Sequence, residues 1–183
     1  MGWNDVGPCA GSKGGDFLTL AQNRYSCRSF SAQPVDPEKL ACILEAGRLA
    51  PTACNKQPVR VWALQSPEAL ARMEKVRGLF GAPLVLMVGY RPADAWVRRF
   101  DGKNGAEVDA AIVTTHLMLS ASDLGLGSVW VGSFDPAALR KAFPETDGHE
   151  ILALLPIGYP APGAAPGPLH AERVSSEAFA VIL

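Results

Sequence analysis

The chain has 183 residues, of which 48% are hydrophobic and 19% are charged, and its formal net charge at pH 7 is −1. This size and composition are typical of one soluble globular domain. The near-neutral charge argues against the basic surface that a nucleic acid or anionic lipid would require. No apolar run approaches the roughly 20 residues that span a bilayer, and the N-terminus lacks the pattern of a signal peptide. We therefore expect a cytoplasmic protein that binds neither nucleic acid nor membrane.

Three segments are predicted along the chain. Residues 1–15 are rich in glycine and show little periodicity, which indicates a flexible arm. Residues 16–160 carry the pattern of a folded domain. Residues 161–183 form a tail that begins irregularly, because it is rich in proline and glycine, and ends in a strongly apolar stretch. An exposed apolar end would be costly, so we expect it to dock as a strand on a partner subunit.

Helix start signals recur through the domain. Asp36-Pro37, Ser66-Pro67 and Asp135-Pro136 each place a capping residue before a proline at the first helical position. They predict helices from residue 37 toward Pro51, over 67–77 and over 136–142, and a short helix is expected after Asp16. Residues 106–124 predict the longest helix. It is apolar on most faces, which indicates burial in the core or in a subunit interface.

The strand signals lie between these helices. Apolar or alternating runs predict strands over residues 59–64, 84–88, 128–131 and 151–155. The elements do not alternate regularly as strand, helix and strand, and no Gly-x-Gly-x-x-Gly follows a strand. This order favours an α+β fold over a doubly wound one. The four cysteines and three histidines lack the local spacing of a metal site or disulfide framework, so we expect no metal and free thiols.

Two polar stretches point to a ligand. Arg24, Ser26 and Arg28 combine two permanently charged, forked donors with a hydroxyl, a set that suits a phosphate. Arginines at the end of a helix are also common without any ligand, because they meet its free carbonyls. The stretch 50–58 is a proline-bounded turn in which Asn55 and Gln57 each offer a donor and an acceptor to a planar heterocycle. A plain turn would use the same residues. Taken together, the two stretches predict a bound mononucleotide such as FMN.

Four motifs, in order, resemble those of the nitroreductase family. They are Arg24-Tyr25-Ser26-Cys27-Arg28, Pro51-Thr52-Ala53-Cys54-Asn55-Lys56-Gln57-Pro58, the stretch 125–134 (Gly-Leu-Gly-Ser-Val-Trp-Val-Gly-Ser-Phe) and the stretch 155–160 (Leu-Pro-Ile-Gly-Tyr-Pro). Tyr25 replaces a second arginine of the family pattern, Thr52 a serine and Val59 a tryptophan. The resemblance runs from about Asp16 to the C-terminus.

The resemblance implies a fold, a cofactor and an assembly. The fold is a small, mostly antiparallel sheet flanked by helices, in an intertwined homodimer with two FMN sites at its interface. Cofactor contacts are implied for Arg24, Tyr25, Ser26, Arg28, Pro51, Thr52, Ala53, Asn55, Gln57, Trp130, Val131, Gly132, Ser133 and Arg173. Of these, Arg24, Ser26 and Arg28 would bind the ribityl phosphate and the pyrimidine side of FMN, and Arg173 would complete the phosphate site. The residues of 51–57 would come from the second subunit, and those of 130–133 would lie near flavin N5.

The implied activity is that of an FMN-dependent oxidoreductase. A hydride from NAD(P)H would pass through flavin N5 to a planar, electron-poor acceptor such as a nitroaromatic or quinone, and no side chain need act as catalyst because the flavin performs the redox chemistry. Two alternatives stay open at this point. One is an FMN-binding storage or sensing protein without turnover, and the other is a dehalogenase or flavin-degrading enzyme of the same fold.

Overall fold

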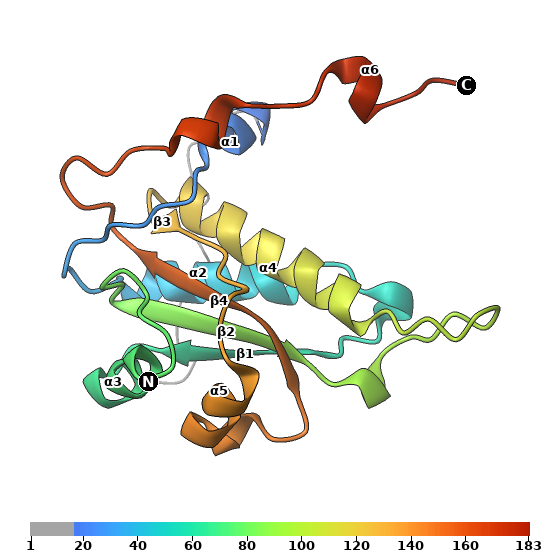
Figure 1. Cartoon of the computed structure of the whole chain (residues 1–183), viewed down its shortest axis with the longest axis horizontal. Helices are drawn as coiled ribbons and strands as arrows, with labels where there is room; N and C mark the ends of the chain where they lie inside the picture. Colours follow the sequence, from blue (N-terminus) through green and yellow to red (C-terminus); the bar gives the residue numbers. More distant parts are fainter. Residues whose placement is uncertain (1–16) are drawn as a thin grey trace.

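A four-stranded antiparallel sheet organises the chain in this computed structural model, which describes residues 17–183 (Figure 1). The strand order is β1-β2-β4-β3. The strands are β1 (Val59–Leu64), β2 (Leu84–Tyr90), β3 (Gly127–Ser128) and β4 (Glu150–Gly158). The predicted α+β class is confirmed. The predicted arm at 1–15 lies outside the described residues, as does Cys9.

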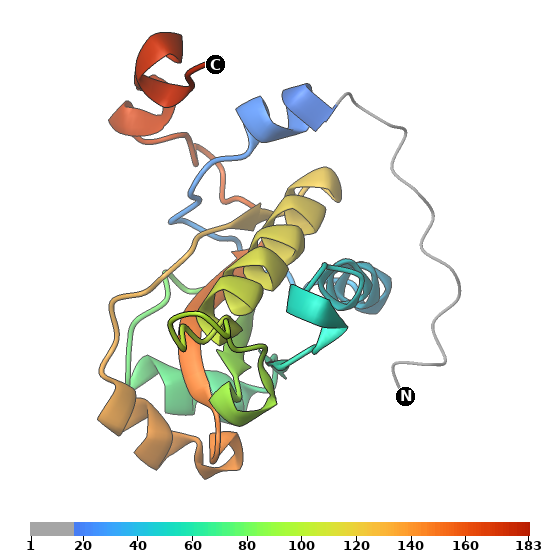
Figure 2. The same cartoon turned by 90° about the vertical axis from the view of Figure 1, so that its right-hand side faces the viewer.

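Helices cover both faces of this sheet, as the end-on view of Figure 2 shows. On one face α2 (Pro37–Arg48) and α4 (Ala106–Asp123) enclose Leu84, Leu86 and Val88, and on the other α3 (Pro67–Glu74) and α5 (Pro136–Ala142) cover Val85 and Met87. Successive side chains of a strand point to opposite faces. The continuous apolar run of β2 therefore contributes side chains to the hydrophobic cores on both faces of the sheet.

Capping explains where the helices begin. The side chain of Ser66 accepts from the backbone N–H of Ala69, and Asp135 accepts from two N–H groups of α5, as expected. Asp36 differs, because its carboxylate makes no cap bond and instead accepts from the hydroxyl of Tyr159 at 2.6 Å. Beside this contact, Lys39 of α2 lies over the Tyr159 ring and donates to the carbonyl of Leu124, the residue that follows α4, at 2.9 Å. Both contacts tie α2 to segments that are distant in sequence.

The edge strand β3 is shorter than the predicted strand 128–131. It covers only Gly127–Ser128, and the next pairing with β4 is an isolated bridge between Val131 and Leu154. Between them, the N–H of Val129 donates to the carbonyl of Pro156 at 3.3 Å. Proline has no N–H to return a bond, so the ladder is interrupted there.

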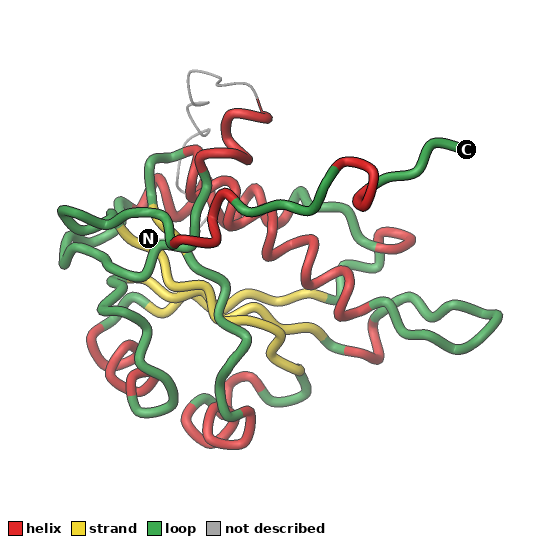
Figure 3. Tube along the Cα trace, turned by 45° about the horizontal axis from the view of Figure 1, so that its top comes forward, coloured by secondary structure: helices red, strands yellow, loops and turns green. Residues whose placement is uncertain are grey.

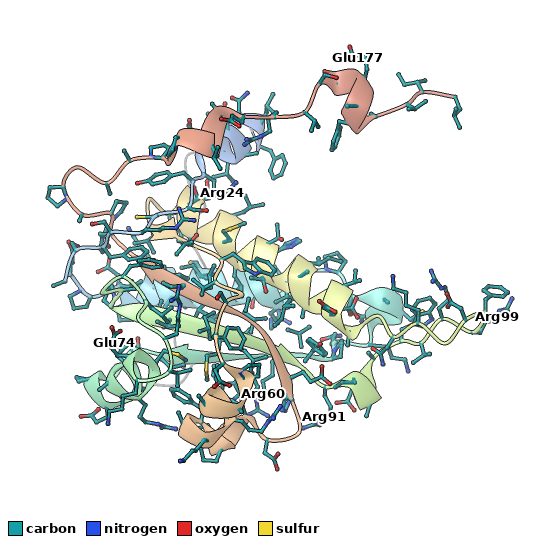
Figure 4. The ribbon with its side chains drawn as sticks, in the orientation of Figure 1. Arg24, Arg60, Glu74, Arg91, Arg99 and Glu177 are labelled. Atoms are coloured by element: carbon teal, nitrogen blue, oxygen red, sulfur yellow. The ribbon has the colours of Figure 1, made fainter. Side chains whose placement is uncertain are left out.

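Two segments leave the body of the domain. A loop between η3 (Pro92–Asp94) and α4 extends as a narrow arm closed by a bridge between Val97 and Asn104, with Arg99 near its tip (Figures 3 and 4). The tail carries η5 (Pro168–Ala171) and α6 (Ser176–Phe179) and projects beyond α1 (Phe17–Asn23). Within residues 17–183, no helix combines the length and apolarity that crossing a membrane requires.

The apolar end of the tail finds no cover within one subunit. Phe179 is 82% exposed and Ile182 is 99% exposed. Residues 176–179 form a helical turn, and 180–183 make no strand in the single chain, so docking on a partner stays a prediction. Among the cysteines, Cys27 and Cys54 are free, whereas Cys42 is disulfide-bonded. The expectation of free thiols is therefore wrong at Cys42, because local spacing does not exclude a bond between distant cysteines.

Candidate functional site

Arginines from two distant segments meet in one pocket. This arginine pocket, of about 360 Å³, is lined by Arg24, Ser26, Arg28, Gly167, Pro168, Leu169, His170 and Arg173. Its lining includes three arginines and a serine, contributed by residues 24–28 and by the tail, and no carboxylate lines it. A pocket with this donor set and no opposing negative charge suits a phosphate dianion.

The segment 24–28 is held against the edge of the sheet. Ser26 forms a parallel bridge with Ser128 of β3, and the N–H of Cys27 donates to the carbonyl of Ser128 at 2.9 Å. A Cβ at Gly127 would lie only 2.7 Å from the Cβ of Cys27. Close approach of the two backbones therefore requires glycine at this position, and it fixes the register of the arginines relative to β3.

The tail closes the pocket from the other side. His170 Nε2 lies 3.1 Å from the carbonyl oxygen of Gln22, and the ring of Tyr25 meets the His170 ring edge-on at 6.4 Å between centroids. Burial raises the pKa of the Tyr25 hydroxyl, and the adjacent Cys27 raises it further. Arg173 donates through Nη1 to the carbonyl of His170 at 2.7 Å. These contacts hold Arg173 in the lining of the arginine pocket, together with Arg24.

The second motif forms a strained turn, which we define as residues 51–57. Cys54, Asn55 and Gln57 have φ values of 50°, 52° and 51°. This left-handed region costs a non-glycine residue about 1–3 kcal/mol. Within the turn, Thr52 Oγ1 accepts from the N–H of Gln57 at 3.0 Å, and Gln57 Nε2 donates to Asn55 Oδ1 at 3.1 Å. The turn leaves the side chains of Asn55 and Gln57 exposed to solvent.

One buried carboxylate anchors the strained turn. Asp109 of α4 is 2% exposed, and its Oδ1 accepts from the N–H of Ala53 at 2.9 Å. Beside the turn lies a second pocket of about 250 Å³, lined by Arg48, Thr52 and Gln57 together with apolar residues of α2, β1 and α4. The turn therefore borders a cavity that is separate from the arginine pocket.

The third motif continues the edge on which the arginine pocket lies. Val131 is buried, whereas Gly132 and Ser133 are exposed. A Cβ built at Gly132 would find its nearest neighbour, Trp130 Nε1, at 3.9 Å. At about 3.3 Å per residue, Gly132 lies about 13 Å along the chain from Ser128. This span is comparable to the distance from the phosphate to the ring system of an extended flavin mononucleotide.

The strained turn lies at the opposite edge of the sheet. It leads into β1, whereas the arginine pocket borders β3, and β2 and β4 lie between these two edges (Figure 1). Three inter-strand spacings amount to about 14 Å. The structure thus brings the first motif, the third motif and Arg173 to one edge of the chain, and does not bring the turn to them.

Two residues in this arrangement escaped the sequence interpretation. His170 gives no sequence signal, because its position against Gln22 and Tyr25 depends on how the tail folds back. Asp109 does give one, since it is the one charged residue among the positions that the helix buries. A carboxylate at such a position calls for a partner.

Comparison with known proteins identifies relatives along most of the chain. The family model described as "Nitroreductase family" matches residues 21–77 and 71–159. A curated relative from Archaeoglobus fulgidus, named as an NADH dehydrogenase/NAD(P)H nitroreductase, is 28% identical over 159 residues, which cover 79% of this chain and 86% of the relative.

Solved structures agree with this match. A nitroreductase family protein from Clostridium difficile is 36% identical, with a TM-score of 0.83, over 91% of this chain and 98% of that one. A nitroreductase from Exiguobacterium sibiricum, described as a complex with FMN, is 20% identical, with a TM-score of 0.80, over 93% of this chain and 98% of that one. At 20% identity, the similarity to the Exiguobacterium protein shows only that the two chains share a fold.

Proposed function

Because this chain belongs to the nitroreductase family, we propose that it is an FMN-dependent oxidoreductase that passes a hydride from NAD(P)H to a planar, electron-poor acceptor such as a nitroaromatic or quinone. The observation that carries this proposal is the arginine pocket, which lies on the same sheet edge as the exposed Gly132. The names of relatives support the reductant, because the Archaeoglobus protein is named for NAD(P)H.

The residues present fit FMN by the chemistry of their donors. Arg24, Arg28 and Arg173 would bind the phosphate, with Ser26 as a neutral donor. Next along the same edge, Trp130, Val131, Gly132 and Ser133 would border the ring system. Gly132 has no Cβ and no close neighbour in that direction, which allows backbone N–H groups to approach the ring closely.

The remaining contacts come from a second copy of the chain. In one subunit the strained turn lies at the β1 edge, and β2 and β4 separate it from a nucleotide held along the β3 edge. A partner subunit would supply Pro51, Thr52, Ala53, Asn55 and Gln57 to the exposed ring edge, with Asn55 and Gln57 as the polar readers. The site is therefore complete only in a homodimer.

The apolar surface of the chain supports this assembly. A broad groove between α1, α2 and α4 exposes the apolar side chains of Phe17, Leu20, Ala46 and Leu119 beside Thr115, His116, Ser120 and Asp123. Val108 of α4 is also exposed, as is the apolar end of the tail at 179–183. Exposed apolar surface of this extent is typical of an interface. We place the groove in the dimer interface and the tail on the partner subunit.

The protein supplies binding and orientation, and bound FMN supplies the hydride-accepting ring. No titratable side chain occurs in the stretch 130–133, so we assign no catalytic residue. The guanidiniums fix the phosphate end, the exposed edge at Gly132 leaves room for a second planar molecule, and the partner's turn orients the polar ring edge.

An absorption spectrum of the purified protein tests the proposal. Flavin bands are expected after purification or after adding FMN, and anaerobic NADH or NADPH should bleach them. A nitroaromatic or quinone should then restore the bands. A protein that takes up no flavin would refute the cofactor, and one whose flavin resists both reductants would refute the oxidoreductase and indicate a flavin store.

A further inference from the structure

Asp109 is a buried carboxylate that the proposed chemistry does not use. Its neighbours on the inward face of α4, among them Ala106, Ala110 and Val113, are apolar. Oδ1 accepts from Ala53, whereas Oδ2 is buried and has no hydrogen-bond partner among the described residues. A carboxylate with an unsatisfied buried oxygen destabilises a fold relative to an apolar side chain of similar size.

The position of Asp109 in its helix offsets only part of this cost. It lies in the first turn of α4, where helix N–H groups and the helix dipole favour negative charge. Glu107, in the same turn, has this advantage while staying exposed. What distinguishes Asp109 is its bond to the N–H of Ala53, 56 positions away in the sequence.

That bond ends on the strained turn. Ala53 directly precedes Cys54 and Asn55, both at positive φ. The turn is also seated on the start of α4, because a Cβ at Gly105 would lie 3.9 Å from the Cβ of Ala53. A strained backbone conformation persists only where contacts with the surrounding structure hold it in place. Among the described residues, Asp109 is the one charged side chain whose hydrogen bond joins α4 to this turn.

We infer that Asp109 is a positioning residue, which accepts the Ala53 N–H to hold the strained turn in the shape that meets the flavin of the partner subunit. This inference rests on the proposed function. Asp109 acts through the backbone, not on the cofactor, so a neutral oxygen acceptor at the same position should hold the turn equally well. The inference therefore separates Asp109→Asn, which keeps the acceptor, from Asp109→Leu, which removes it.

The experiment measures FMN dissociation constants by flavin fluorescence, together with the melting temperature of the apoprotein. Asp109→Leu should raise the Kd about tenfold or more, as expected for loss of a hydrogen bond to a charged acceptor. Asp109→Asn should stay within about threefold of the wild type. Glu107→Ala is the matched control, because it removes a negative charge from the same helical turn without touching residues 51–57, and its Kd should not change.

A backbone variant tests the same bond from its other end. Ala53→Pro removes the donor N–H, and it suits the first position of η2 (Ala53–Asn55) because Thr52 is already extended at ψ 155°. It should weaken FMN binding, and adding Asp109→Leu to Ala53→Pro should cost nothing further, because coupled residues are not additive. If Asp109→Leu alone lowers the melting temperature, Ala53→Pro still tests the same hydrogen bond, because it leaves Asp109 in place.

Three results would overturn the inference. They are unchanged FMN affinity in both Asp109→Leu and Ala53→Pro, a loss in Asp109→Asn equal to that in Asp109→Leu, and additive losses in the double variant. Failure of the proposed function is distinguishable, because the wild-type protein would then bind no FMN at all.

Discussion

Arg28→Ala offers the sharpest test of the arginine pocket. Arg28 is exposed, and within residues 17–183 its side chain makes a single long hydrogen bond of 3.4 Å, to the carbonyl of Ser26. Its guanidinium is therefore free to bind an anion. A hydrogen bond to a charged group contributes about 1.5–3 kcal/mol, and exposure to solvent favours the lower end. A loss of about 1.5 kcal/mol corresponds to a roughly tenfold higher Kd for FMN.

Riboflavin makes this measurement specific to the phosphate. It carries the same ring and ribityl chain as FMN but no phosphate, so Arg28→Ala should leave its Kd unchanged while that of FMN rises. The difference should shrink with added salt, because salt screens charges near the surface. Both ligands are titrated by flavin fluorescence. Arg77→Ala serves as the control, since Arg77 is an exposed arginine following α3, outside the arginine pocket.

Two outcomes would refute the reasoning. Equal FMN affinity in Arg28→Ala and wild type would remove Arg28 from the phosphate site. An equal loss for FMN and riboflavin would show that the substitution disturbs the whole site, not a phosphate contact.

Three further predictions follow from the structure. Gly127→Ala should destabilise the protein by about 1–3 kcal/mol and lower its melting temperature, because the new Cβ would lie 2.7 Å from the buried Cys27 Cβ. Burial, and donation to the Glu150 carboxylate, raise the pKa of Tyr90 to about 12, so stability that the neutral phenol provides should be lost as pH rises from about 10 toward that value. The ionisation of Tyr90 can be followed as the difference in ultraviolet absorbance between the wild-type protein and the Tyr90→Phe variant as the pH is raised. Removing residues 176–183 should shift the protein from dimer toward monomer in sedimentation.

Each of these has its own control. Gly78→Ala should be tolerated, since its Cβ would meet only the flexible Glu74 carboxylate, at 3.1 Å; an equal loss of stability in both glycine variants would contradict the packing argument. Glu150→Gln should lower the pKa of Tyr90, and an unchanged titration would show that the carboxylate does not control it. A shortened chain that remains fully dimeric would remove the tail from the interface.

The sequence determined the local elements and the chemistry of the donors. Helix α5 occupies the predicted residues 136–142, and β1 occupies the predicted 59–64, because caps, prolines and side-chain periodicity act over a few residues. The same local information misplaced the ends of β3 and the cap role of Asp36. There the outcome depended on Pro156 and Tyr159, which come from other parts of the chain.

Only the tertiary structure decided which of these residues meet. Packing of the tail beside α1 brought Arg173 and His170 to Arg24, although some 150 residues separate them in sequence. The strand order placed the turn of Asn55 on the far edge from that pocket. Asp109 reached Ala53 because α4 packs against all four strands, including the edge strand β1 into which the turn leads. Such juxtapositions arise from burying two apolar faces of one sheet, a property of the whole chain that no short window of sequence contains.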